Sequence, residues 1–294
     1  MALHNLVSRR FLSIMLMLPL LAACSKVGFS QESAPAVTTN GDPNPGPGDN
    51  YPPGNGTNTD IKGSPVCQNI PAVTRDTRII FIVDQSGSNG VATKNNGTVP
   101  CTSSDTNCTP ATDPNKTFRG TAIQKFFDKY QSKGNFSWSF LTFQGNSAYT
   151  LIGNSASTAI SSDQAAMQGA IDTFRATTDE QGTPYKKALQ LAKNVIAADP
   201  GLNGSRSPQY AVVFVSDGFP TDYGNDYMAA DINALLGVAS DRITLSTIYY
   251  GQVQDPAAIE LLTKMAERGK GRFANAENVN DLQIDDVIPE QICK

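Results

Sequence analysis

Two short runs of apolar residues, without any polar interruption, most constrain the fold of this chain. They are Ile79–Val83 and Tyr210–Val215. A strand with such a run is covered on both faces, as in a parallel sheet with helices on each side, whereas a half-exposed antiparallel strand alternates apolar and polar residues. The runs therefore predict strands at the centre of an α/β domain.

Segments of strand and helical periodicity alternate around these runs. Strands are predicted near residues 136–140, 149–152, 243–250 and 272–274, and helices near 118–130, 167–174, 188–196, 232–238 and 257–266. This alternation predicts a doubly wound, mainly parallel sheet with helices on both faces. The neighbouring strands near residues 136 to 152 would add one antiparallel edge.

The first 23 residues have the pattern of an export signal. Arg9 and Arg10 precede an apolar stretch from Phe11 to Leu21, which is shorter than the about 20 residues of a membrane-spanning helix. The Leu-Ala-Ala-Cys that follows resembles the lipobox of bacterial lipoproteins, which implies a lipid on Cys24. Residue 25 is not the Asp that retains enteric lipoproteins in the inner membrane. We therefore expect an outer-membrane anchor, with the protein facing the periplasm or the exterior; the alternative is a secreted protein with a free Cys24.

Residues 24–66 are rich in Pro, Gly and Asn and contain few apolar side chains. Such a segment cannot bury enough apolar surface to fold, so it predicts a disordered tether. Residues 67–294 are enough for one α/β domain with its own core.

The charge and histidine content exclude several functions. Two of the 23 basic residues lie in the signal, so 21 face 27 acidic residues in the exported chain. No basic run offsets this balance, so nucleic acid is not an expected partner. The only histidine, His4, also lies in the signal, which excludes Ser-His-Asp or Cys-His catalysis and His-ligated zinc or copper. Any bound metal is expected to be hard and oxygen-ligated.

Four cysteines remain besides Cys24, an even number in an exported protein. Of the three pairings that four cysteines allow, we expect Cys101 with Cys108, which lie close together in a polar segment. Cys67 with Cys293 would then join the two ends of the domain. The alternative is a zinc site of four thiols, but the chain has no Cys-x-x-Cys.

Oxygen-bearing side chains follow the two apolar runs and precede one predicted helix. Asp84, Ser86 and Ser88 come directly after the first run, Asp217 follows the second, and Thr183 precedes a helix that begins near residue 185. Ligand sites of open α/β sheets lie at the carboxyl ends of the strands, so these side chains are expected to meet. Singly, each has a simpler explanation, since Thr183 can cap the helix and Asp217 can form a turn.

In this order, the Asp84-x-Ser86-x-Ser88 motif, Thr183 in Gly-Thr-Pro and Asp217 in Ser-Asp-Gly resemble the metal-ion-dependent adhesion site of von Willebrand factor A domains. The resemblance covers roughly residues 75–290. It implies that the two serines, Thr183 and Asp217 bind a divalent cation directly or through water, and that Asp84 coordinates or orients a water. An oxygen-only set suits Mg²⁺, with Mn²⁺ or Ca²⁺ as alternatives, and leaves a position for a partner's carboxylate.

Two features depart from that family. Gln181 stands where glycine is common, and Asp179 and Glu180 before it could change the affinity for the cation or repel an acidic ligand. Residues 89–116, mostly polar and including Cys101 and Cys108, intervene where the family passes almost directly into a helix. Long loops are often functional, although a tolerated surface insertion is the alternative. We hypothesise that this disulfide-bridged loop shapes or partly covers the ligand site.

The sequence thus predicts a lipid-anchored binding protein of the cell envelope that is not an enzyme. It would engage an envelope or extracellular protein through a divalent cation bridged to an acidic residue of that partner. One alternative is a structural envelope component whose metal only stabilises the loops. A metal-dependent hydrolase is the other, and it would need an Asp, Glu or Lys as general base.

Overall fold

The computed structural model describes residues 75–94, 99–102, 104–222, 226–251 and 253–288. The expected signal peptide (1–23), the lipid site Cys24, the tether (24–66) and the pair Cys67 and Cys293 lie outside these residues. Among the helices that are described, none combines the length and apolar character that crossing a membrane requires.

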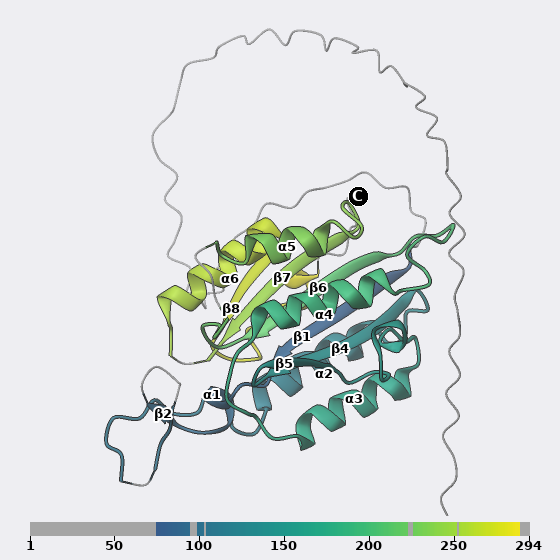
Figure 1. Cartoon of the computed structure of the whole chain (residues 1–294). Coiled ribbons are helices and arrows are strands. Elements are labelled where there is room, and N and C mark those ends of the chain that lie inside the picture. The colour runs from purple at the N-terminus through teal and green to yellow at the C-terminus, as the bar shows by residue number, and fades with distance from the viewer. Residues whose placement is uncertain (1–74, 95–98, 103, 223–225, 252, 289–294) are drawn as a thin grey trace, which may run out of the picture. The chain divides into compact units, whose positions relative to one another are not determined.

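A six-stranded sheet with helices on both faces forms the centre of the domain (Figure 1). Its strands lie in the order β5-β4-β1-β6-β7-β8, and β5 alone in this sheet is antiparallel to its neighbour. The bounds are β1 Thr77–Asp84, β4 Phe136–Gln144, β5 Ser147–Thr150, β6 Gln209–Ser216, β7 Ile243–Tyr250 and β8 Lys270–Ala276. The predicted doubly wound, mainly parallel α/β sheet with one antiparallel edge is confirmed.

Among the described residues, five longer helices cover the sheet, and three short ones lie in the connections. The longer ones are α2 Thr117–Tyr130, α3 Gln164–Ala176, α4 Tyr185–Ala197, α5 Ala229–Leu236 and α6 Pro256–Arg268; the short ones are α1 Gly87–Gly90, the 3₁₀ turn Ala156–Thr158 and α7 Ile284–Val287. Side-chain caps begin two of them, because Asp163 and Asp255 each accept a backbone hydrogen bond at 2.9 Å from the second residue of their helix.

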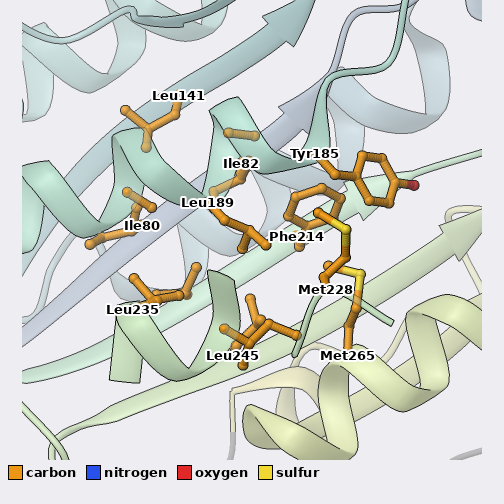
Figure 2. Close-up of a cluster of buried hydrophobic side chains, with 14 of the residues drawn as sticks. Ile80, Ile82, Leu141, Tyr185, Leu189, Phe214, Met228, Leu235, Leu245 and Met265 are labelled. Carbon is orange, nitrogen blue, oxygen red and sulfur yellow. The ribbon is translucent and has the colours of Figure 1, made fainter. Parts of the chain in front are cut away.

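Alternate residues of β1 enter two separate cores. Ile80 and Ile82 pack with α4, α5 and α6 on one face of the sheet (Figure 2). Ile79, Phe81 and Val83 pack with α2 and α3 on the other face. All five side chains are fully buried, which explains why this run has no polar interruption.

Two segments differ from the sequence-based expectation. The edge strand β5 begins two residues before the expected 149–152, because Gly145, at φ +56°, turns the chain directly after β4. The polar segment after α1 contains a two-stranded antiparallel ribbon, β2 (Thr93–Lys94) with β3 (Val99–Pro100), where a loop was expected. Strands of two residues carry no periodicity, so the sequence pattern could not indicate them.

Candidate metal centre

The site lies where the parallel strands β1 and β6 end side by side. Asp84 is the last residue of β1, and Asp217 directly follows Ser216 at the end of β6. Because the two strands are adjacent and parallel, both carboxylates reach the same edge of the sheet. Asp84 is 0% and Asp217 8% exposed, so both acids are largely removed from water.

Hydrogen bonds join the two serines to these carboxylates. The backbone N–H of Ser86 donates to Oδ1 of Asp84 at 2.7 Å, which folds the turn back on the strand. The hydroxyl oxygens of Ser86 and Ser88 are 3.1 Å apart, and Ser88 Oγ donates to Oδ1 of Asp217 at 3.3 Å. The structure therefore brings together four of the five residues expected to form the site.

Thr183, the fifth, lies in the loop before α4, and it lines the same open groove as Ser86, Ser88 and Asp217. Gly182 in that loop has φ +98°, and a Cβ there would meet the carbonyl oxygen of Gly145 at 2.2 Å, so only glycine allows the loop to cross the β4–β5 turn so closely. Thr183 N–H donates to Thr221 Oγ1 at 3.1 Å, which ties this loop to the one that follows Asp217. Pro184, not Thr183, is the N-cap of α4, so the explanation of Thr183 as a helix cap is wrong.

A chain of hydroxyls behind Asp84 was missed by the sequence analysis. Ser216 Oγ donates to Oδ2 of Asp84 at 2.5 Å and accepts from the hydroxyl of Tyr185 at 2.6 Å. Tyr185 packs its ring against Phe214 in the core, so its hydroxyl is held at the edge of the apolar cluster (Figure 2). Ser216 precedes Asp217 in the same motif, which was the one available signal.

Asn89 was missed as well, although it directly follows the serine motif. Its side chain is fully buried, and its amide nitrogen lies 3.4 Å from Oδ1 of both Asp84 and Asp217 and 3.3 Å from the hydroxyl of Ser86. The hydroxyl of Tyr250, at the end of β7, donates to Oδ1 of Asn89 at 2.5 Å. Asn89 thus places a neutral donor between the two carboxylates.

Both carboxylates are difficult to ionise in this environment. Burial, followed by the charge of Asp217, raises the pKa of Asp84 to about 7, although hydrogen bonds from Ser216 and Ser86 oppose the shift. Burial also raises the pKa of Asp217, against a hydrogen bond from Thr112 and the charge of Arg119. A nearby positive charge favours the ionised form of both acids, so the pair is suited to a bound cation.

The donor set fits a hard divalent ion. Two adjacent ligands of an octahedral ion at about 2.1 Å are separated by about 3 Å. The 3.1 Å between Ser86 Oγ and Ser88 Oγ and the 3.3 Å between Ser88 Oγ and Asp217 Oδ1 are close to this spacing. Oxygen donors with two carboxylates match the preference of Mg²⁺, Mn²⁺ and Ca²⁺.

A buried ion network supports the site from behind. The guanidinium of Arg119 donates to the backbone carbonyl of Asp84 at 2.6 Å and lies 3.0 Å from carboxylate oxygens of both Asp113 and Asp179. Lys116 lies 3.4 Å from Asp179. The Asp179 side chain is only 2% exposed and is paired with both Arg119 and Lys116, so its charge is largely compensated, and its expected effect on cation affinity or on an acidic ligand stays a prediction. Glu180 is exposed, and for that residue the expectation stays a prediction.

An open groove of about 990 Å³ passes over the site. Its walls contain residues from the ligand loops, from the segment after α1 and from the loop before α6. They are Ser86, Gly87, Ser88, Thr93, Thr109, Thr112, Gln181, Gly182, Thr183, Asp217, Gly218, Phe219, Pro220, Thr221, Tyr249, Val253, Asp255, Pro256 and Ala257.

No protein-family model and no curated protein matches the sequence. Among solved structures, the chain is similar to a von Willebrand factor type A protein from Catenulispora acidiphila at 13% identity and a TM-score of 0.50, over 70% of this chain and 40% of that one. It also resembles the vWF domain of the type V pili tip protein Mfa5 from Porphyromonas gingivalis at 14% identity and a TM-score of 0.47, over 72% of this chain and 92% of that one. A third similar structure is proximal thread matrix protein 1 from the mussel byssus with a zinc-occupied MIDAS motif. Its identity is 16% and its TM-score 0.47, over 72% of this chain and 44% of that one. By the first of these similarities and the strand order, the described domain has the fold of a von Willebrand factor type A domain.

Proposed function

We propose that this domain is a non-enzymatic binding module that engages a protein partner through a divalent cation held by Asp84, Ser86, Ser88, Thr183 and Asp217. The observation that carries the proposal is the convergence of two buried carboxylates and two serine hydroxyls at one edge of the sheet. A cation bound there supplies positive charge and a coordination position for an anionic oxygen of another molecule. We infer that Mg²⁺ is the resident ion and that Cys24 anchors the protein by lipid to the cell envelope.

The residues around the site hold the ligands rather than activate a reactant. Ser216 and Tyr185 fix one oxygen of Asp84, and Asn89 contacts both carboxylates. The exported chain contains no histidine, and the two acids of the site are engaged with hydroxyl and amide donors. These contacts favour recognition over a reaction that needs a free general base.

Affinity capture from native membranes tests the proposal. The full-length chain should retain a partner in Mg²⁺ and release it in EDTA, and Ser86→Ala or Asp217→Ala should abolish capture while leaving the circular dichroism spectrum unchanged. Ser205→Ala, an exposed serine in the segment before β6 and outside both the motif and the groove lining, is the matched control and should capture normally. If chelation lowers thermal stability without releasing the partner, the metal only braces the loops. If Ser86→Ala captures the partner undiminished, the cation does not form the contact.

A further inference from the structure

The inserted loop (residues 91–115) is fixed to the cation-binding turn at both of its ends. At its start, Val91 N–H donates to the carbonyl of Gly87 at 3.2 Å. At its end, Thr112 N–H donates to the carbonyl of Ser88 at 3.1 Å, and Asp113 N–H donates to that of Asn89 at 3.1 Å. Every residue from Gly87 to Asn89 therefore has a backbone bond to the inserted loop, which extends from the α1 side of the domain (Figure 1).

The inserted loop is also braced internally. Cys101 and Cys108 form a disulfide, and Lys94 pairs with Asp105 at 2.7 Å. Thr93 and Thr109 exchange two backbone hydrogen bonds, at 2.9 and 2.7 Å, which add a third segment to the β2–β3 ribbon. These cross-links reduce the number of conformations open to the described parts of the loop, residues 91–94, 99–102 and 104–115.

Three threonines of the inserted loop line the groove over the cation site, and we call them the threonine wall. They are Thr93, Thr109 and Thr112, and the Thr112 side chain also hydrogen-bonds Asp217. Thr93 is only 2% exposed, so Thr109 and Thr112 offer the accessible part of the wall. Phe219 and Val253, which are 40% and 54% exposed, lie elsewhere on the lining of the same groove. Five large apolar side chains are exposed among the described residues, and four of them belong to the groove or to the inserted loop: Val91, Val99, Phe219 and Val253. Of these, Phe219 and Val253 lie on the groove itself, where they offer an apolar contact to a ligand.

The charges of the groove limit what it can hold. Its described lining contains no Lys or Arg, and its charged members are Asp217, which belongs to the cation site, and Asp255, which caps α6. A divalent ion held by two carboxylates is close to neutral as a unit and offers one place for one more carboxylate. A second acidic group on the ligand would meet no positive partner and would be repelled by Asp255.

We propose that the inserted loop and the cation site form one composite groove for an extended protein segment that carries a single carboxylate among uncharged, partly apolar residues. The carboxylate of this segment binds the cation. Its backbone and small polar groups contact the threonine wall, and one of its apolar side chains packs beside Phe219 and Val253. This inference rests on the proposed function, because it assumes that the carboxylate of the ligand binds to the cation. It adds that the inserted loop determines which carboxylate-bearing segments are accepted.

Short synthetic peptides test this specificity on the full-length chain. In Mg²⁺, peptides with one central Glu flanked by Val, Phe and Ala should bind more tightly than the same peptides with Asp or Glu as neighbours, and peptides with Gln in the centre should not bind. Thr109→Lys places a cation in the exposed part of the threonine wall, and it should shift the preference toward peptides with a second acidic residue by about fivefold. Thr106→Lys, exposed on the same loop but not on the groove lining, is the matched control and should not change the ratio.

The outcomes separate the two proposals. If binding of Glu-centred peptides requires Mg²⁺ and is lost in Ser86→Ala, but Thr109→Lys and Thr106→Lys change the preference equally or not at all, the composite groove is wrong and the cation contact remains. If peptide binding is the same in Mg²⁺ and EDTA, the proposed function is wrong as well. Failure of every Glu-centred peptide to bind the parent protein overturns the composite groove.

Discussion

The hydroxyl of Tyr250 donates to Oδ1 of Asn89 at 2.5 Å, and this bond points the Asn89 amide nitrogen at the carboxylates of Asp84 and Asp217. The ring of Tyr250 is in turn stacked on Phe118 of α2, with 4.9 Å between ring centroids. The site is therefore oriented from β7, a strand that contributes no expected ligand of its own. Residues behind a metal ligand commonly set its orientation and thereby the affinity for the metal.

Tyr250→Phe should weaken Mg²⁺ binding by about tenfold, because Asn89 loses the bond that holds its amide toward the carboxylates. Isothermal titration calorimetry measures this change. Tyr210→Phe is the matched control, since the Tyr210 hydroxyl donates to Asp199 at 2.8 Å away from the site. Both variants should lose about 1 kcal/mol of stability, the usual value of one hydrogen bond. Equal cation affinity in the two variants would show that Tyr250 has no positioning role.

The affinity for Mg²⁺ should rise with pH up to about 7 and then level off, because burial raises the pKa of Asp84 to about 7 and the cation binds the ionised acid. The unfolded chain releases this proton near the ordinary value of 3.8, so the contribution of Asp84 to metal-free stability is complete below that pH and is lost as the pH rises toward 7. Thermal unfolding without metal should therefore show that the stability of Asp84→Asn increases relative to that of the parent protein as the pH rises over this range. A constant difference between the two proteins would contradict the assignment.

Arg119→Met should lower the free energy of unfolding by about 3 kcal/mol or more, because Asp113 and Asp179 are left buried without their main cationic partner. Urea denaturation followed by circular dichroism measures this loss. Lys129→Met removes an exposed ion pair with Asp285 and should cost less than about 1 kcal/mol. Similar losses in the two variants would mean that the Arg119 network is not a structural support.

Replacing both Cys101 and Cys108 by serine should destabilise the inserted loop by about 2 kcal/mol, the loop-closure entropy of a short disulfide loop. The loop is attached to the turn Gly87–Asn89 and is not part of the central sheet. Its opening should therefore appear as faster proteolytic cleavage within residues 91–115, with little change in the melting temperature of the domain. The parent protein under reducing conditions should behave in the same way. Unchanged cleavage would show that backbone bonds alone order the loop.

The central sheet could be predicted from the sequence because its strands carry strong local patterns. The run Ile79–Val83 is uninterrupted for a physical reason that the structure shows, namely that α4 to α6 cover one face and α2 and α3 the other. The convergence of Asp84 and Asp217 followed from the rule that parallel strands end at the same edge. These inferences needed only periodicity and topology.

The contacts behind the ligands could not be predicted in this way. Asn89 and Tyr250 are 161 positions apart, and nothing in the apolar pattern of β7 distinguishes its last tyrosine from a core residue. Arg119 looks like an ordinary helical surface residue until Asp113, Asp179 and the Asp84 carbonyl are placed around it. Partner choice among distant polar residues depends on three-dimensional distances that single-sequence patterns do not contain.

The inserted loop begins and ends on neighbouring residues of one short turn, at the carbonyls of Gly87 and Ser88. A segment of another length or composition that keeps these two backbone bonds should therefore fit the same turn without altering the sheet beneath it. A foreign hairpin with the same two backbone attachments could thus be grafted in place of the inserted loop. Such grafts would allow new ligand preferences to be engineered onto one unchanged cation site.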